Sequence, residues 1–116
     1  VAAISPLIDL KVSCRMLEKP SNYLFQYHFV KGLKKKIREQ KFELSSFVDP
    51  EAFLGIKTVR EYDRLVTIPL TQFRNVEDYY ERASAIHYLK YIRVPTLLIH
   101  AQDDPFLPWR PFWHQR

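Results

Sequence analysis

Cysteine is almost missing from this chain, because Cys14 is its single example in 116 residues. One cysteine cannot form a disulfide within the chain, so nothing favours an oxidising compartment and we expect a cytoplasmic protein. The chain also lacks any Cys/His pairing with the spacing of a metal site, and we therefore predict no bound metal.

Glycine and long apolar runs are scarce as well. Two glycines are too few for the glycine-rich loops that hold nucleotide phosphates, so we predict no cofactor. No apolar run approaches the roughly 20 residues of a membrane span. The first residues also lack the basic flank of a signal peptide. We therefore expect no membrane span in this segment.

The residues that are abundant indicate a folded protein. Hydrophobic residues make up 47% and aromatic residues 15% of the chain, which argues against disorder. A chain of this length is one domain or a piece of one.

The net charge of +5 is concentrated in one basic block. Such a block can bind an acidic partner, either nucleic acid or an anionic membrane. It is also typical of the solvated face of a helix, where positive charge near the C-terminus interacts favourably with the helix dipole. The second interpretation needs no partner, and we expect no nucleic acid. The basic block consists of Lys31, Lys34, Lys35, Lys36, Arg38 and Lys41.

The most informative stretch is an apolar run at residues 94–101, which is followed by Asp103, Asp104 and Pro105. The run is short, rich in branched side chains and does not alternate, as is typical of a strand buried on both faces of a parallel sheet. The carboxylates would lie just past its carboxyl end, where open α/β sheets bind ligands. An ordinary turn accounts for the same residues, because Asp and Pro both favour turns.

A second apolar run at residues 1–4 predicts another strand, and helix start signals fill the chain between the two runs. We predict that Asp9 caps a helix that ends near residue 19. Ser21 or Asn22 is expected to cap the longest helix, at residues 23–40. The apolar face of this helix is predicted to consist of Tyr23, Tyr27, Val30, Leu33 and Ile37.

Three further helices are predicted from their first residues. Asp49 precedes a proline and an acid, Thr58 begins a capping box, and Asn75 repeats the start signal. A crossover between adjacent parallel strands usually needs only one helix, so the additional helices indicate an inserted lid. Two strands also need neighbours and covering helices. We therefore expect the middle-to-late portion of a larger α/β domain.

These elements give a division of the chain into four parts. We expect a core strand and loop at residues 1–10, and a helical lid or cap insertion at residues 11–91. A core strand with an acid-bearing loop is expected at residues 92–108, followed by a tail at residues 109–116.

Three segments of the sequence, at residues 57–70, 77–84 and 92–106, match a known family, as does Ile4-Ser5-Pro6 near the start. In these segments the chain resembles the α/β-hydrolase superfamily and, within it, the YheT-like esterases. The resemblance implies a partial α/β-hydrolase fold in which two parallel strands flank a helical lid insertion.

In such hydrolases the catalytic triad runs in the chain order Ser, acid, His. The resemblance implies that Asp104 is the acid, and its neighbour Asp103 is the next candidate. No Gly-x-Ser-x-Gly elbow is present, so Ser5, Ser45, Ser46 and Ser84 are not expected to be nucleophiles. His114 lies in a segment that does not match the family. We expect His28, His87 and His100 to be structural or solvated.

The resemblance implies the lid and acid-bearing portion of a serine carboxylesterase that acts on short- to medium-chain esters or lipids. Because the nucleophile and the base are missing, we predict that the 116 residues alone are inactive. The alternative is a non-catalytic, truncated relative that binds an acidic partner through its basic helix. Open strand edges also predict possible self-association.

Overall fold

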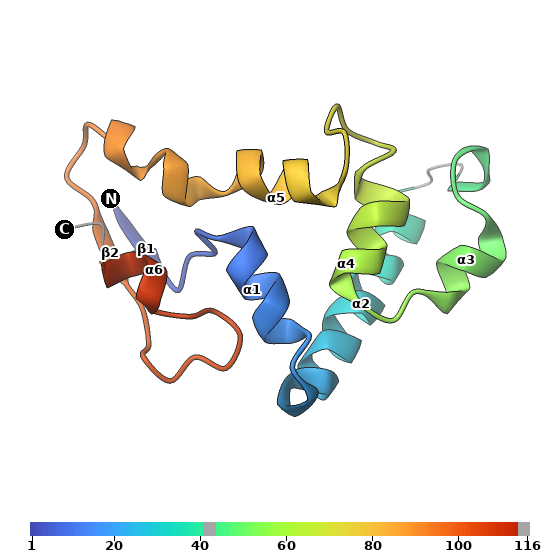
Figure 1. Ribbon diagram of the computed structural model, residues 1–116, viewed down its shortest axis with the longest axis horizontal. Coiled ribbons are helices and arrows are strands. Elements are labelled where there is room, and N and C mark those ends of the chain that lie inside the picture. The colour runs from blue at the N-terminus through green and yellow to red at the C-terminus, as the bar shows by residue number, and fades with distance from the viewer. Residues whose placement is uncertain (41–43, 114–116) are drawn as a thin grey trace.

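The two strands of this chain lie side by side at one end of the molecule (Figure 1). The structure is a computed structural model, and it describes residues 1–40 and 44–113. Strand β1 (Ala2–Ile4) pairs with β2 (Leu97–Ile99) in parallel, with Ala2 opposite Leu97. The predicted parallel pair is therefore confirmed, and both strands end at the same edge.

The predicted burial of the second strand on both faces is wrong. Strand β2 is shorter than the apolar run that predicted it, and Leu97 and Ile99 are 59% and 47% exposed. The physical reason is that β1 is its only neighbour among the described residues, and helices do not cover both faces. A short two-stranded sheet cannot bury its side chains by itself.

The first two helices follow β1 almost as predicted. The side chain of Asp9 accepts a hydrogen bond from the Val12 amide at 3.0 Å and caps α1 (Leu10–Leu17). After a 3₁₀ turn at Pro20–Asn22, helix α2 covers Tyr23–Glu39.

The predicted apolar face of α2 is partly wrong. Val30 and Ile37 are buried, but Tyr23 and Tyr27 are exposed, and Gln26 is buried instead. Gln26 is held by polar contacts, because its side chain donates to the Leu17 carbonyl and accepts from the Val59 amide. These partners come from other helices, so the spacing of apolar residues along α2 could not indicate them.

The remaining helices begin at the predicted caps. Asp49 caps α3 (Pro50–Gly55), and Thr58 caps α4 (Val59–Tyr62), which continues as a π-helical turn at Asp63–Thr67. Asn75 caps α5 (Val76–Ala83). Short 3₁₀ turns occur at Leu44–Ser46, Ala85–His87 and Leu89–Tyr91, and α6 covers Arg110–Trp113.

The buried core lies among the helices rather than beside the sheet. One cluster packs α2, α3 and α4 together around Val66, which is 1% exposed. A smaller cluster joins α1 to α5 through Cys14, Val76 and Tyr80. In the part of the chain that the structure describes, no helix combines the length and apolarity that crossing a membrane requires. The members of the larger cluster are Val30, Ile37, Val48, Phe53, Ile56, Tyr62 and Val66.

The capping box of α4 gives a direct test of this fold. The Thr58 hydroxyl accepts from the Glu61 amide at 3.1 Å, and the Glu61 carboxylate accepts from the Thr58 amide at 3.2 Å. We expect Thr58→Ala to lower the free energy of unfolding by about 1 kcal/mol, because it removes one half of this exchange. Urea unfolding measures the change. Thr58→Ser keeps the hydroxyl and should retain most of the stability, so an equal loss in both variants would contradict the prediction.

Candidate functional site

Asp104 lies in the loop that leaves the carboxyl end of β2. Its Oδ1 atom accepts hydrogen bonds from the backbone amides of Phe106 at 3.1 Å and Leu107 at 2.8 Å. Asp104 is half-buried, whereas Asp103 beside it is exposed. Two fixed donors on one oxygen restrict the rotation of the carboxylate. The structure therefore gives Asp104, and not Asp103, a defined orientation.

The loop that carries Asp104 is attached to the start of α2. The side-chain amide of buried Asn22 donates to the Pro105 carbonyl at 2.7 Å and to the Met16 carbonyl at 2.8 Å. Asn22 occupies the N-cap position of α2, one of the two positions predicted, but its side chain makes no cap hydrogen bond to that helix. The amide instead satisfies two carbonyls that approach it from different segments.

An aromatic contact strengthens this attachment. The ring of Phe106 lies with its centre 5.4 Å from that of Phe25 and 5.7 Å from that of Phe29, both on α2. Tilted and edge-on rings at such distances attract one another beyond the burial of their surface. The residue two positions after Asp104 is therefore packed against the helical segment.

The end of β1 contributes a second unusual residue at the same edge of the sheet. Ser5 has a φ angle of +46°, in the left-handed region that residues other than glycine seldom occupy. Its amide donates to the Ile99 carbonyl at 2.8 Å, which holds the two strand ends together. Backbone strain of this kind is common where a fold supports a functional site.

The three histidines in the described ranges have surroundings other than the Asp104 carboxylate. His100 donates from Nε2 to the Leu107 carbonyl, and its ring stacks on Phe112 at 4.5 Å. His28 is exposed on α2, and His87 is exposed and pairs with Glu81 at 3.4 Å. His114 lies outside the described residues. In the described ranges, both hydrogen bonds received by Asp104 come from backbone amides rather than from an imidazole.

The candidate serines differ in their surroundings. Ser84 is 2% exposed, accepts from the Leu10 amide at 3.0 Å and donates to the Tyr80 carbonyl, so its hydroxyl connects α1 to α5. Ser45 is exposed in a 3₁₀ turn. These positions agree with the expectation that neither residue is a nucleophile on a strand-to-helix elbow.

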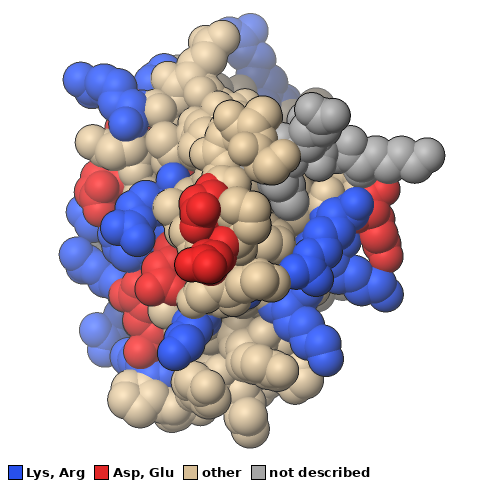
Figure 2. Space-filling model, turned by 90° about the vertical axis from the view of Figure 1, so that its right-hand side faces the viewer, with Lys and Arg blue, Asp and Glu red and all other residues tan. Residues whose placement is uncertain are grey.

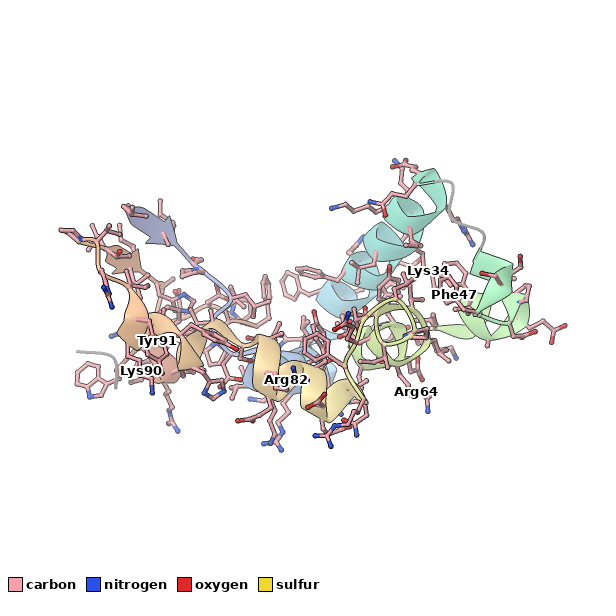
Figure 3. The ribbon with its side chains drawn as sticks, turned by 90° about the horizontal axis from the view of Figure 1, so that it is seen from above. Lys34, Phe47, Arg64, Arg82, Lys90 and Tyr91 are labelled. Atoms are coloured by element: carbon pink, nitrogen blue, oxygen red, sulfur yellow. The ribbon has the colours of Figure 1, made fainter. Side chains whose placement is uncertain are left out.

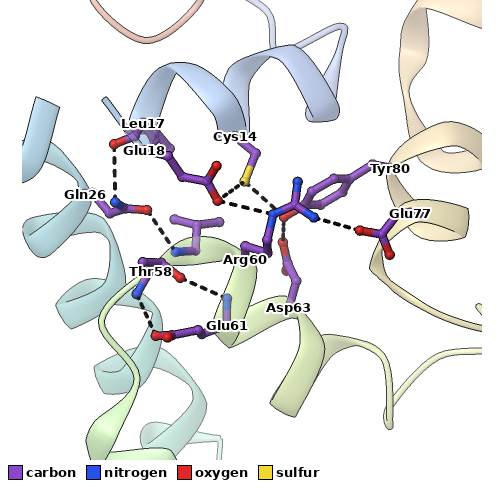
Figure 4. A network of polar contacts seen from close by, with 11 residues as sticks. Cys14, Leu17, Glu18, Gln26, Thr58, Arg60, Glu61, Asp63, Glu77 and Tyr80 are labelled. Carbon is purple, nitrogen blue, oxygen red and sulfur yellow. Dashed lines mark hydrogen bonds and ion pairs between the residues drawn. The ribbon is translucent and has the colours of Figure 1, made fainter. Parts of the chain in front are cut away.

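A second polar cluster, drawn in Figure 4, was not predicted from the sequence. Asp63 is buried, and its carboxylate accepts from the Tyr80 hydroxyl at 2.7 Å and from the Thr67 hydroxyl at 2.8 Å. Burial raises the pKa of Asp63, and the two hydrogen bonds only partly oppose this rise. Burial also raises the pKa of the Cys14 thiol, 3.4 Å from the same Tyr80 hydroxyl.

Arg60 closes this cluster toward solvent. Its guanidinium bonds Glu18, which directly follows α1, at 3.2 Å and Glu77 on α5 at 2.7 Å (Figure 4). It also lies over the Tyr80 ring, 5.5 Å from the ring centre. The described partners in this cluster come from α1, α4 with its π-helical turn, and α5, which indicates that the cluster fastens these helices together. No sequence pattern signals it, because its members are widely separated along the chain.

Several residues of the basic block make contacts within the fold. The ammonium of Lys34 donates to the Leu54 and Ile56 carbonyls at 2.9 and 2.8 Å, at the end of α3. Lys35 pairs with Glu39 at 3.8 Å, and Arg38 lies over the Phe53 ring at 5.3 Å. Lys31 and Lys36 are exposed, and Lys41 lies outside the described residues. Within the described ranges no cluster of three potential metal ligands occurs.

Comparison with known proteins gives several relatives. The chain is 31% identical to the phospholipase ABHD3 of Mus musculus over 93 residues, which cover 79% of this chain and 23% of that protein. It is 42% identical to the putative esterase YheT of Escherichia coli over 53 residues, which cover 46% of the chain and 16% of the relative. An abhydrolase domain-containing protein of Dictyostelium discoideum is 27% identical over 97 residues, 79% of this chain and 25% of that protein.

This chain belongs to the α/β-hydrolase superfamily. The resemblance seen in its motifs, including the YheT-like branch, is thus confirmed. No family model matches this α/β-hydrolase chain. No solved structure matches it either. The chain spans about a quarter of the length of the ABHD3 proteins that it matches, since it covers 23% of each.

The buried carboxylate of Asp63 predicts a pH dependence of stability. The folded chain raises its pKa above the ordinary value of 3.8, so the protonated acid is favoured in the folded state. The stability from this preference is fully present below pH 3.8 and is lost as pH rises through the folded-state pKa. Asp63→Asn cannot ionise and still accepts from Tyr80. We therefore expect its stability to increase relative to the wild type as pH rises across that window.

Urea unfolding at a series of pH values measures this difference. Asp103→Asn is the matched control, because it makes the same chemical change at an exposed position. A stability difference between Asp63→Asn and the wild type that stays constant with pH would contradict the prediction.

Proposed function

We propose that this chain is the lid and acid-bearing portion of a serine carboxylic-ester hydrolase that acts on short- to medium-chain esters or lipids. Three relatives support the ester chemistry by name: a phospholipase, a putative esterase and the monoacylglycerol lipase of Saccharomyces cerevisiae. The last is 44% identical over 52 residues, 45% of this chain and 12% of that protein. The structural observation that carries the proposal is the oriented carboxylate of Asp104 beyond the end of β2.

Asp104 is proposed to act on the substrate through a histidine. Its carboxylate would accept the Nδ1–H of that ring, hold the tautomer and stabilise the imidazolium that forms when the serine loses its proton. The serine oxygen would attack the ester carbonyl, expel the alcohol and form an acyl-enzyme, which water then hydrolyses. Because the backbone amides bond Oδ1, Oδ2 is the atom that we assign to the histidine.

Residues 11–91 are proposed to form the lid, between core parts at residues 1–10 and 92–108. This assignment is supported by the run of helices from α1 to α5 between two paired strands. Contacts from Asn22 and Phe106 link this helical segment to the acid loop. The lid would therefore be attached beside the acid that we assign to catalysis. Self-association through open strand edges stays a prediction.

Neutralising the proposed acid tests this function in the full-length protein. We expect Asp104→Asn to lower kcat for a short-chain ester by about 10,000-fold with little change in KM, because an amide cannot stabilise the imidazolium. Steady-state hydrolysis of a chromogenic ester provides the measurement.

Asp103→Asn is the matched control and should keep wild-type kcat, since Asp103 is exposed and lies outside the proposed triad. A full loss in Asp103→Asn with retained activity in Asp104→Asn would transfer the role to the neighbouring residue. Wild-type activity in both variants would refute the acid loop as part of the active site.

The missing nucleophile gives a second test. We expect a fluorophosphonate probe to label the full-length protein on one serine and to leave the 116-residue chain unlabelled. Mass spectrometry of the labelled protein locates the serine. Stoichiometric labelling of a serine within these 116 residues would show that the nucleophile had been misassigned.

A further inference from the structure

A groove with a volume of about 730 Å³ runs between α2 and the segment that follows α3. This volume lies within the range of small-molecule sites, which is about 300–1,000 Å³. One wall is a stripe of α2 that includes Tyr23, Tyr27 and Lys34, whose spacing places them on one side of the helix. The opposite wall is formed by Leu54, Ile56 and Lys57.

The charges that line the groove are nearly all positive. Lys31, Lys34, Lys35, Arg38 and Lys57 contribute cations, and Glu39 is the only acid among the lining residues that the structure describes. Lys35 pairs with this glutamate at 3.8 Å, whereas the other three cations on α2 and Lys57 on the opposite wall have no acid partner among the described lining residues. Figure 2 shows basic side chains standing out on the end of the molecule that carries α3.

Lys34 is a fixed cation within this groove. Its ammonium donates to the Leu54 and Ile56 carbonyls, which hold it between the two walls. Figure 3 labels Lys34 on α2. An ammonium has three donors, and these two bonds leave one of them for an anion in the groove. Such an anion would meet a charge whose position is already set.

The other end of the groove is aromatic and exposed. Tyr23 and Tyr27 are 64% and 50% exposed, and they lie one turn apart on α2. About 16 Å of helix separates Tyr23 from Lys34, at 1.5 Å per residue. The faces of these rings present apolar surface that an alkyl chain would remove from water.

We propose that this groove binds a single-chain amphiphile with an anionic headgroup. The headgroup, a carboxylate or a phosphate, lies among Lys31, Lys34 and Lys57, and the chain lies along Tyr23 and Tyr27. The proposal does not depend on the hydrolase activity, because it concerns equilibrium binding alone.

Isothermal titration of the full-length protein tests the headgroup and the chain separately. Dodecanoate and dodecyl phosphate, kept below their micelle concentrations, carry both parts of the proposed ligand and differ in the headgroup. Dodecanol retains only the chain, whereas butyrate and inorganic phosphate retain the anion. We expect at least one of the two charged amphiphiles to bind about tenfold more tightly than dodecanol and than its own short anion. This affinity should fall as salt increases.

Charge reversal locates the site. We expect Lys31→Glu and Lys57→Glu each to weaken binding of the charged amphiphile by about tenfold, because an attraction becomes a repulsion at close range. Lys36→Glu makes the same change on α2 at an exposed lysine that does not line this groove, so its affinity should match the wild type. Tyr27→Gln should weaken binding of the amphiphile without changing that of butyrate or phosphate.

Three results would overturn the proposal. Dodecanol binding as tightly as both charged amphiphiles would exclude recognition of the anion. An equal loss from Lys36→Glu would indicate attraction to the net charge rather than to the groove. Binding to anionic lipid vesicles without binding of either soluble amphiphile would identify a membrane surface instead. Circular dichroism of each variant shows whether it is folded, so that a loss of binding can be distinguished from unfolding.

Discussion

The side-chain amide of Asn22 is the interaction on which the arrangement of this chain depends. The helices have their own buried clusters, whereas the sheet consists of three paired positions with exposed side chains. Asn22 connects these unequal parts, because one nitrogen donates to a carbonyl in the last turn of α1 and to another in the acid loop. Without that donor, two carbonyls would lose a partner, and unpaired polar groups away from water are costly.

Local signals in the sequence were sufficient for the helix starts and for the positions of the two strands, whereas the parallel pairing of the strands followed from the family resemblance. Asp9, Asp49, Thr58 and Asn75 all cap helices, because a short polar side chain satisfies amides only a few residues away. The position of Asp104 past a strand followed from the apolar run and the family resemblance. Its role in catalysis and the cytoplasmic location stay predictions.

These local signals could not predict side-chain contacts between residues far apart in the sequence. Asn22 lies at the N-cap position of α2, but its side chain bonds the Pro105 carbonyl instead of the helix. Sequence patterns could not indicate this contact, because Pro105 lies 83 positions away. Gln26 interrupts the expected apolar face of α2 and is buried by partners on other helices. The carboxylate of Asp63 is likewise buried by Tyr80. These polar residues are buried in the fold, whereas an assignment from the spacing of apolar residues places them on the surface.

The π-helical turn at Asp63–Thr67 has a consequence for how this segment tolerates change. The amide of Ile68 reaches back five residues to the Asp63 carbonyl at 2.8 Å, one residue more than in an α-helix. Compared with an unbroken α-helix, everything downstream is rotated by about 100°, the angle of one residue. Removing a single amino acid here would restore regular winding and turn the following side chains out of phase with their neighbours. The π-helical turn thus contains one more residue than an α-helical turn, and the packing of the residues that follow depends on that extra residue.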